Sequence, residues 1–146
     1  MNKIITTEVT KIFTRVRTMS EYIGAKHLDK DPMAYARISA IEADDDLFRE
    51  MVPGLMSRLS SDLGCHLLGF SISGGLITLT LELSKGHKEA LLPDMAVDLE
   101  AYIVYSLLSE WLKIAYSGTH TTYGEIAESF AENLRRKVSC KTKPIA

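Results

Sequence analysis

The sequence lacks the short motifs that most often mark a catalytic or metal centre. It contains no Cys-x-x-Cys pair, no His-Glu-x-x-His run and no Gly-x-Ser-x-Gly elbow. Its four histidines are dispersed, and none is spaced three or four residues from a second histidine or cysteine, as zinc ligands often are. The Ser-Gly-Gly stretch has neither of the glycine spacings that cradle phosphate. We therefore expect no enzyme, no metal and no cofactor, although either thiol could become reactive through the fold.

Cysteines are few, and long apolar runs are absent. Cys65 and Cys140 lie 75 positions apart, which favours two lone thiols of a cytosolic chain over a disulfide framework. The N-terminal stretch MNKIITTEVTK has no apolar core of a signal peptide. Residues 101–116 are the most apolar stretch, but serine, glutamate and lysine interrupt it, so no membrane span is expected. We expect a soluble protein that is made in a cytoplasm.

Length and composition are those of an ordinary globular protein. The 146 residues are 46% apolar and 25% charged, which suits one domain with a hydrophobic core of its own. We expect a single helical domain over residues 1–138, followed by a basic C-terminal arm over 139–146.

Acidic residues are missing from the end of the chain. No acid follows Glu132, whereas five cations do: Arg135, Arg136, Lys137, Lys141 and Lys143. The whole chain has a net charge of −2, but the rest of it holds 12 basic against 19 acidic residues, a net charge of −7. The first three cations suit the last turn of a helix, where they offset its dipole. The other two lie beyond that helix, and we assign all five as candidate contacts with an acidic partner or DNA.

Helical periodicity appears in four stretches of the chain. Apolar residues recur every three or four positions over 7–26, 42–64, 95–116 and 121–138. Thr6 or Thr7 can cap the first helix, and Pro53 should kink or break the second. Residues 28–40 have the composition of a linker, which Tyr35, Ile38 and Ile41 can pin to the core.

Three consecutive aspartates precede the second helix. Asp44, Asp45 and Asp46 could be a cation site, but adjacent acids at a helix start diverge and lack the alternating spacing of a calcium loop. Their position favours a helix cap and first turn that complement the positive end of the dipole.

Residues 65–83 change to the period of β-strands. Leu68, Phe70 and Ile72 alternate on one run, and four apolar residues alternate on the next, with Gly74 and Gly75 between them as a tight turn. A lone hairpin is marginal in water, so its apolar face should lie on the helices or join another chain's sheet. The predicted fold is mainly α with one β-hairpin, in the order helix–helix–hairpin–helix–helix.

The third predicted helix is apolar almost all round. Such a helix is either central in its own fold or covered by another subunit. Its aromatic residues share the helix with leucines, which favours core or interface packing over base stacking. We assign Tyr102, Tyr105 and Trp111, with Gly74 and Gly75 of the hairpin, as candidate subunit-interface residues.

Several stretches together resemble a known family. These are EYIGAKH, YARI followed by ADDDLFREM, the hairpin, LLSEWLKI, and TTYGEIAESFAENLRRK followed by KTKP. Their order is similar to that in small virion-associated proteins of tailed bacteriophages and prophages of gut bacteria, which look like head–tail connector (neck or adaptor) components. The likeness covers nearly the whole chain at scattered positions, and Pro53-Gly54 departs from the uninterrupted helix of the family.

The resemblance implies a homo-oligomeric ring around the DNA channel of a virion assembled in the host cytoplasm. The implied partners are other copies of the chain, the portal and the tail or neck proteins, with non-specific DNA contact in the channel and no membrane. The residues also leave open a small regulatory or nucleic-acid-binding module that uses the basic C-terminal tail.

Overall fold

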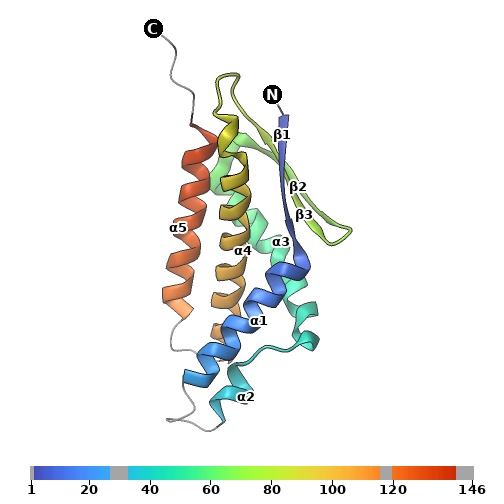
Figure 1. Ribbon diagram of the computed structural model, residues 1–146, viewed down its shortest axis with the longest axis vertical. Coiled ribbons are helices and arrows are strands. Elements are labelled where there is room, and N and C mark those ends of the chain that lie inside the picture. The colour runs from blue at the N-terminus through green and yellow to red at the C-terminus, as the bar shows by residue number, and fades with distance from the viewer. Residues whose placement is uncertain (1, 27–32, 116–119, 141–146) are drawn as a thin grey trace.

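The structure is a computed structural model that describes residues 2–26, 33–115 and 120–140 (Figure 1). It is mainly helical and carries one small antiparallel sheet, which confirms the mainly α class. The helices are α1 (Val9–Lys26), α2 (Ala34–Ile38), α3 (Asp45–Leu63), α4 (Leu92–Ala115) and α5 (His120–Val138). The strands are β1 (Asn2–Glu8), β2 (Leu67–Ser73) and β3 (Leu76–Glu82).

Residues 2–8 form a strand, whereas the sequence predicted a helix that begins near residue 7. β1 runs antiparallel to β3, and α1 begins only at Val9, so Thr6 and Thr7 belong to the sheet and do not cap the helix. Ile5 and Thr7 are buried while their neighbours are exposed, which is the period of a strand. This segment gains its ladder hydrogen bonds from β3, about 70 positions away in sequence, and local patterns do not report such a partner.

The predicted hairpin is present and is part of a larger sheet. β2 and β3 pair antiparallel, and the strand order is β1-β3-β2, so β3 is the centre. Ile77, Leu79 and Leu81 are fully buried toward the helices, as the alternation predicted. On β2 buried and exposed side chains alternate less regularly. The pairing with β3 shifts its register between Leu67 and Gly69, and Leu68 at this point is 53% exposed.

The helix that contains Pro53 is continuous. α3 runs from Asp45 to Leu63 with the proline inside it, so the helix is not broken there. Asp45 and Asp46 lie in its first turn, as predicted for acids near the positive end of the dipole. The carboxylate of Asp44 accepts a hydrogen bond from the backbone N–H of Ile41 at 2.8 Å, which closes the short turn before α3.

Part of the predicted linker is helical. Residues 27–32 lie outside the described structure, but α2 occupies Ala34–Ile38, which corrects the expectation of an irregular segment. Ile38 is fully buried and does pin the segment, Tyr35 is half-buried, and Ile41 is 62% exposed and does not. The indole N–H of Trp111 donates to the carbonyl of Ile38 at 2.6 Å, so a distant side chain fixes this short helix.

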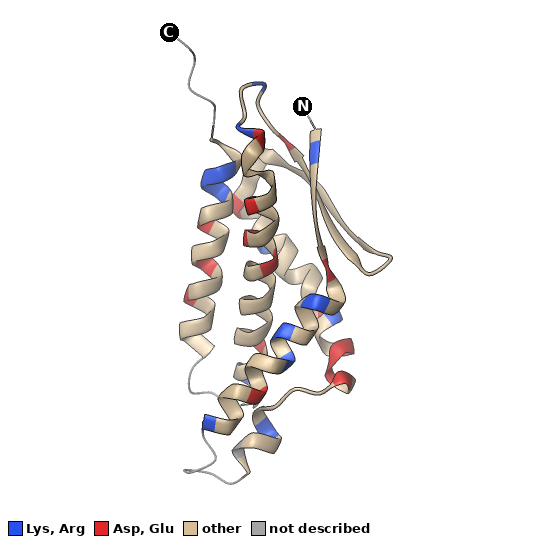
Figure 2. Ribbon diagram, viewed as in Figure 1, with Lys and Arg blue, Asp and Glu red and all other residues tan. Residues whose placement is uncertain are grey.

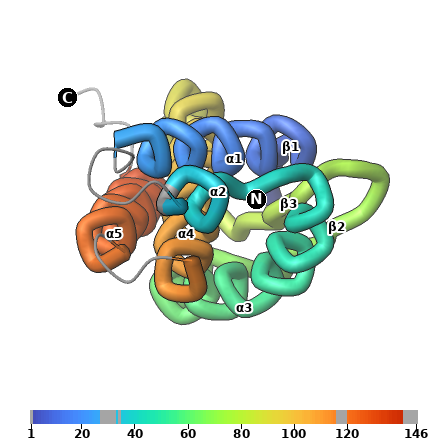
Figure 3. The backbone as a smooth tube through the Cα atoms, turned by 90° about the horizontal axis from the view of Figure 1, so that it is seen from below, coloured from blue at the N-terminus to red at the C-terminus, as the bar shows by residue number. Residues whose placement is uncertain are grey.

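The long apolar helix is central in its own fold. Figure 3 shows α1 and α3 on opposite sides of α4. In the same view α5 lies to the left of α4 and the sheet to the right. Phe13 of α1, Phe48 of α3 and Trp111 of α4 meet in the core, with successive ring centroids 5.8 and 5.7 Å apart. Of the two explanations for its apolar surface, burial within the single chain accounts for most of α4.

Candidate functional site

The sheet has one covered face and one open face. Residues on the even positions of β1 are exposed, whereas the odd positions of β3 lie on the helices. The open face carries several threonine and serine side chains together with Ile4 and Leu76, which are 62% and 40% exposed. Leu68 is also exposed, at the irregularity of β2. Exposed apolar groups on an uncovered sheet are typical of a surface that meets another protein.

A shallow groove lies beside β1. Its volume is about 240 Å³, and its lining comes from β1, the start of α1, β3 and the first turns of α4. Val97 on α4 is 61% exposed at this groove, while Glu100 is mostly buried between Lys11 at 3.9 Å and Arg15 at 3.7 Å. Because the outer edge of β1 pairs with no strand of the described chain, the groove combines free backbone groups with an apolar wall.

The predicted interface aromatics lie largely inside the single chain. Tyr102 is 4% exposed and donates from its hydroxyl to the carbonyl of Leu55 at 2.9 Å, and Trp111 is 8% exposed. Tyr105 is half-buried and stacks on Phe130, with ring centroids 5.8 Å apart. The core of the single chain therefore takes up the side chains of Tyr102 and Trp111, which leaves little of either exposed.

The two hairpin glycines lie at the exposed tip of the sheet. Gly74 and Gly75 have φ angles of 59° and 76°, the left-handed region that favours glycine. They form the turn between β2 and β3 as predicted, and the carbonyl of Gly75 accepts a hydrogen bond from the N–H of Val9 at 2.9 Å.

The cations at the end of α5 have separate local roles. Arg135, Arg136 and Lys137 occupy its last turn, as the sequence predicted. Both arginines are exposed and pair with Glu132, and the bond from Arg135 holds the pKa of that carboxyl below its usual value. Lys137 instead binds the buried carboxylate of Asp98 at 2.6 Å.

The last described residues remain attached to the fold. The carbonyl of Cys140 accepts a hydrogen bond from the N–H of Lys88 at 3.1 Å, so this last described residue is held against the loop before α4. Lys141 and Lys143 lie outside the described residues. Residues 139–140 of the predicted arm are thus part of the described structure, and residues 141–146 lie outside it.

Basic residues gather at the end of the molecule where α5 finishes. Figure 2 shows the cations at the end of α5 near those of the loop before α4, where Lys85 and Lys88 are exposed. Lys3 at the start of β1 pairs with Glu89 of the same loop at 3.2 Å. Arg135 and Arg136, which the sequence analysis assigned as candidate DNA contacts, thus have other cations near them at this end of the molecule.

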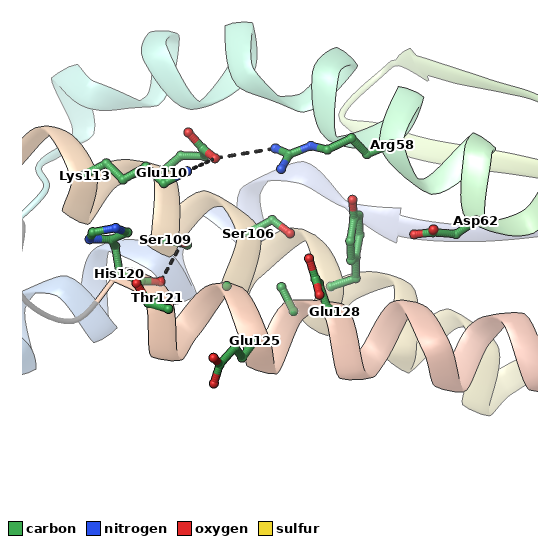
Figure 4. A pocket seen from close by; sticks show the side chains of 13 residues that line it. Arg58, Asp62, Ser106, Ser109, Glu110, Lys113, His120, Thr121, Glu125 and Glu128 are labelled. Atoms are coloured by element: carbon green, nitrogen blue, oxygen red, sulfur yellow. Dashed lines mark hydrogen bonds and ion pairs between the residues drawn. The ribbon is translucent and has the colours of Figure 1, made fainter.

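A polar groove lies between α3 and α5, with α4 as its floor (Figure 4). Its volume is about 380 Å³. Glu110 stands in it between Arg58 at 3.5 Å and Lys113 at 3.1 Å, and Ser109 donates to the backbone carbonyl of His120 at 2.8 Å. Small residues on α4 and α5 leave this space open: a Cβ at Gly124 would lie 3.2 Å from the hydroxyl oxygen of Ser109.

Tyr102, on the floor of this groove, has a raised pKa. Burial raises the pKa of the Tyr102 hydroxyl above its ordinary value, and the carboxylates of Asp62 and Glu128 add to this, while Arg58 opposes it. The hydroxyl is protonated at neutral pH and donates its hydrogen bond to the Leu55 carbonyl. The groove offers hydrogen bonds and charge, but no side chain in it is arranged as an activated nucleophile with a base.

Ligating groups do not converge within the described residues. No three His, Cys, Asp or Glu side chains come together there in a way that could hold a metal ion. Cys65 and Cys140 are both free thiols, as expected for lone cysteines. In the described part of the chain, no helix combines the length and apolar character needed to cross a membrane.

Sequence reasoning missed the open sheet face and the groove beside β1, because both depend on β1 being a strand. The alternation of Ile5, Thr7 and Val9 was the available signal, but it overlaps the helical period that starts at Val9.

The comparisons with known proteins identify no relative. No protein family matches the chain, and neither the curated proteins nor the solved structures give a significant match.

Proposed function

We propose that the protein is a structural assembly subunit, a head–tail connector that forms a homo-oligomeric ring between the portal and tail of a tailed bacteriophage. The observation that supports this most is the open sheet: one face packs on the helices, and the other leaves Ile4 and Leu76 exposed. These residues lie beside the outer edge of β1, which pairs with no strand of the described residues. Exposed apolar groups and an unpaired strand edge favour aggregation of a monomer, but they serve as contact surfaces in a protein that binds neighbouring subunits.

Two different surfaces of the subunit suit a ring better than a closed dimer. A ring needs a head-to-tail contact in which one surface of each subunit meets a different surface of the next. Here the groove beside β1 combines apolar side chains with charges of both signs, whereas the end of the bundle is rich in cations. The resemblance to connector proteins adds the partners: portal on one side, tail or neck proteins on the other, in the virion.

Sedimentation velocity tests the proposal directly. The chain should form a discrete oligomer alone or when mixed with the portal protein of the same phage, and negative-stain images of that species should show rings. Monomers under both conditions, up to high protein concentration, would overturn it.

Matched surface changes locate the interface. Ile4→Asp and Leu76→Asp place a charge on the open sheet face and should weaken assembly. Ile114→Asp is the control, because Ile114 is also exposed (64%) but lies on α4 away from the sheet. Equal loss of assembly in all three variants would show that the open face is not the contact.

A second candidate function is nucleic-acid binding through the basic end. It is favoured by the exposed Arg135 and Arg136 near Lys85 and Lys88. Electrostatic binding to DNA should weaken steeply with salt, by a slope of roughly 0.9 per phosphate contact in a double-logarithmic plot. Changing the four cations to alanine should reduce that slope if this candidate holds, while DNA binding that is absent at low salt would exclude it.

A further inference from the structure

The free edge of β1 has a defined hydrogen-bonding pattern. The N–H of Val9 donates to the carbonyl of Gly75 and extends the β1–β3 ladder by one position. In an antiparallel strand the N–H and C=O of one residue point to the same side, and the side alternates from residue to residue. The odd positions of β1 therefore bond to β3, and the groups that point to the free edge belong to Asn2, Ile4, Thr6 and Glu8.

This edge has no backbone partner within the described residues. Apart from the sheet ladder and the Val9 bond, no backbone–backbone hydrogen bond in the described part of the chain involves residues 2–8. The groove beside it carries the exposed Val97 as an apolar wall and the exposed carboxylate of Glu8 at one end. A groove between an edge strand and a helix is a common place for an extended segment to add as a further strand.

We infer that residues 141–146 of a second copy of the chain, K-T-K-P-I-A, add to β1 as an antiparallel strand. The inference rests on the self-assembly proposed above and names the contact that joins neighbouring subunits. Three features carry it: charge, side-chain register and the position of a proline.

Charge and apolar character match in one register. With Lys141 opposite Glu8, Lys143 falls opposite Thr6 and diagonal to Glu8, which places both cations beside the carboxylate. In the same register Ile145 lies opposite Ile4, the most exposed apolar residue of the strand. Opposite charges and apolar pairs directly across strands both stabilise a sheet.

The proline fits the same register. Residues 141, 143 and 145 stand opposite the positions of β1 whose backbone groups face the edge, so their own N–H and C=O groups point toward β1. Pro144 then lies opposite Ile5 at a non-hydrogen-bonded position, where its missing N–H is not needed. Shifting the register by one residue would leave the proline facing an unpaired carbonyl of β1.

The donor is a second copy, because the chain's own arm begins at the wrong end of β1. Cys140 is hydrogen-bonded to Lys88, and the adjacent Glu89 binds Lys3, so the last described residue lies near the start of β1 of its own chain. Lys141 has to reach Glu8, five positions farther, about 17 Å along a strand. An arm that leaves beside Lys3 of its own chain can only run parallel to β1, which separates its lysines from Glu8.

Disulfide trapping tests this placement. In a chain with Cys65→Ser and Cys140→Ser, the pair Glu8→Cys with Lys141→Cys should form intermolecular disulfides, because opposed residues in a hydrogen-bonded pair have Cα atoms about 5.5 Å apart. Non-reducing electrophoresis should show a ladder of covalent oligomers. The control pair Ile4→Cys with Lys141→Cys is four positions out of register and should give little or none.

Each outcome of the trapping experiment has a distinct meaning. A ladder from the matched pair alone supports the inference. No ladder, or an intramolecular bond, from a chain that still sediments as an oligomer overturns the arm placement and leaves the proposed ring intact. A chain that sediments as a monomer in all conditions overturns both.

Two variant series check the register without cysteine. Glu8→Lys should weaken association about two- to fivefold for each contact, and adding Lys141→Glu and Lys143→Glu should restore it. Ile145→Pro removes an N–H that points to β1 and should disrupt assembly, whereas Thr142→Pro alters a position that points away and should be tolerated. Equal effects of the two prolines would contradict the register.

Discussion

The ammonium group of Lys137, at the end of α5, lies 2.6 Å from the carboxylate of Asp98 on α4. Asp98 is buried, and the backbone carbonyl of Lys137 also accepts a hydrogen bond from the ring of the buried His87 at 2.7 Å. One residue of the basic tail therefore ties the loop before α4, the start of α4 and the end of α5 together, and its cation is not available to a partner.

This pair predicts a large difference among the tail cations. Lys137→Ala leaves the Asp98 carboxylate buried without its partner and should destabilise the fold by about 2–4 kcal/mol. Arg136→Ala, which removes an exposed pair with Glu132, should change stability by less than about 1 kcal/mol. Urea unfolding of both variants checks this, and the double change Asp98→Leu with Lys137→Met should recover much of the loss. Equal small effects would mean that the buried pair is not formed.

The strand assignment of the N-terminal segment predicts opposite behaviour of two adjacent isoleucines. Ile5 is 4% exposed under the helices, so Ile5→Ala should cost about 2–5 kcal/mol. Ile4 is 62% exposed on the other face, and Ile4→Ala should change the stability of the monomer by less than about 0.5 kcal/mol. Thermal or urea unfolding at low protein concentration separates the two. Similar losses for both would contradict the alternation of a strand.

Two glycines should respond oppositely to alanine. Gly75 has a φ of 76°, so Gly75→Ala forces a side chain into the left-handed region and should cost about 1–2 kcal/mol. Gly54 lies within α3 with open space where a Cβ would be placed, so Gly54→Ala should stabilise the protein by about 0.5–1 kcal/mol. Urea midpoints of the two variants give the signs. Stabilisation by Gly75→Ala would show that the turn adopts another conformation.

Stability should fall in alkaline solution because of Tyr102. Above pH 10 an unfolded tyrosine releases its proton while the buried Tyr102, whose pKa is raised, still holds it. The unfolded state then binds fewer protons than the native state, so the free energy of unfolding decreases as pH rises.

Removing this hydroxyl isolates the effect. Tyr102→Phe loses the bond to the Leu55 carbonyl and should be about 1 kcal/mol less stable at pH 8, but its stability should fall less steeply between pH 9.5 and 11. Tyr22→Phe is the control, because Tyr22 is 63% exposed, and it should keep the slope of the unaltered protein. Urea midpoints across this pH range measure the slopes, and parallel slopes for all three proteins would rule out Tyr102 as their source.

The sequence by itself determined the features that depend on neighbouring residues. Helical periodicity located α1, α3, α4 and α5 to within a few residues, because one face of each is apolar over several turns. Gly74-Gly75 located the turn between β2 and β3, because positive φ angles restrict the residue type there. The cations of the last turn of α5 were likewise predicted from the helix dipole.

Only the tertiary structure decided what those elements contact. It made residues 2–8 a strand, because the partner that satisfies their backbone, β3, lies about 70 positions away. It placed Tyr102 and Trp111 of α4 in the core by supplying the carbonyls of Leu55 and Ile38, which are distant in sequence, as hydrogen-bond acceptors. It also separated Lys137 from Arg135 and Arg136, since the burial of Asp98 depends on how α4 and α5 pack and not on the sequence around either residue.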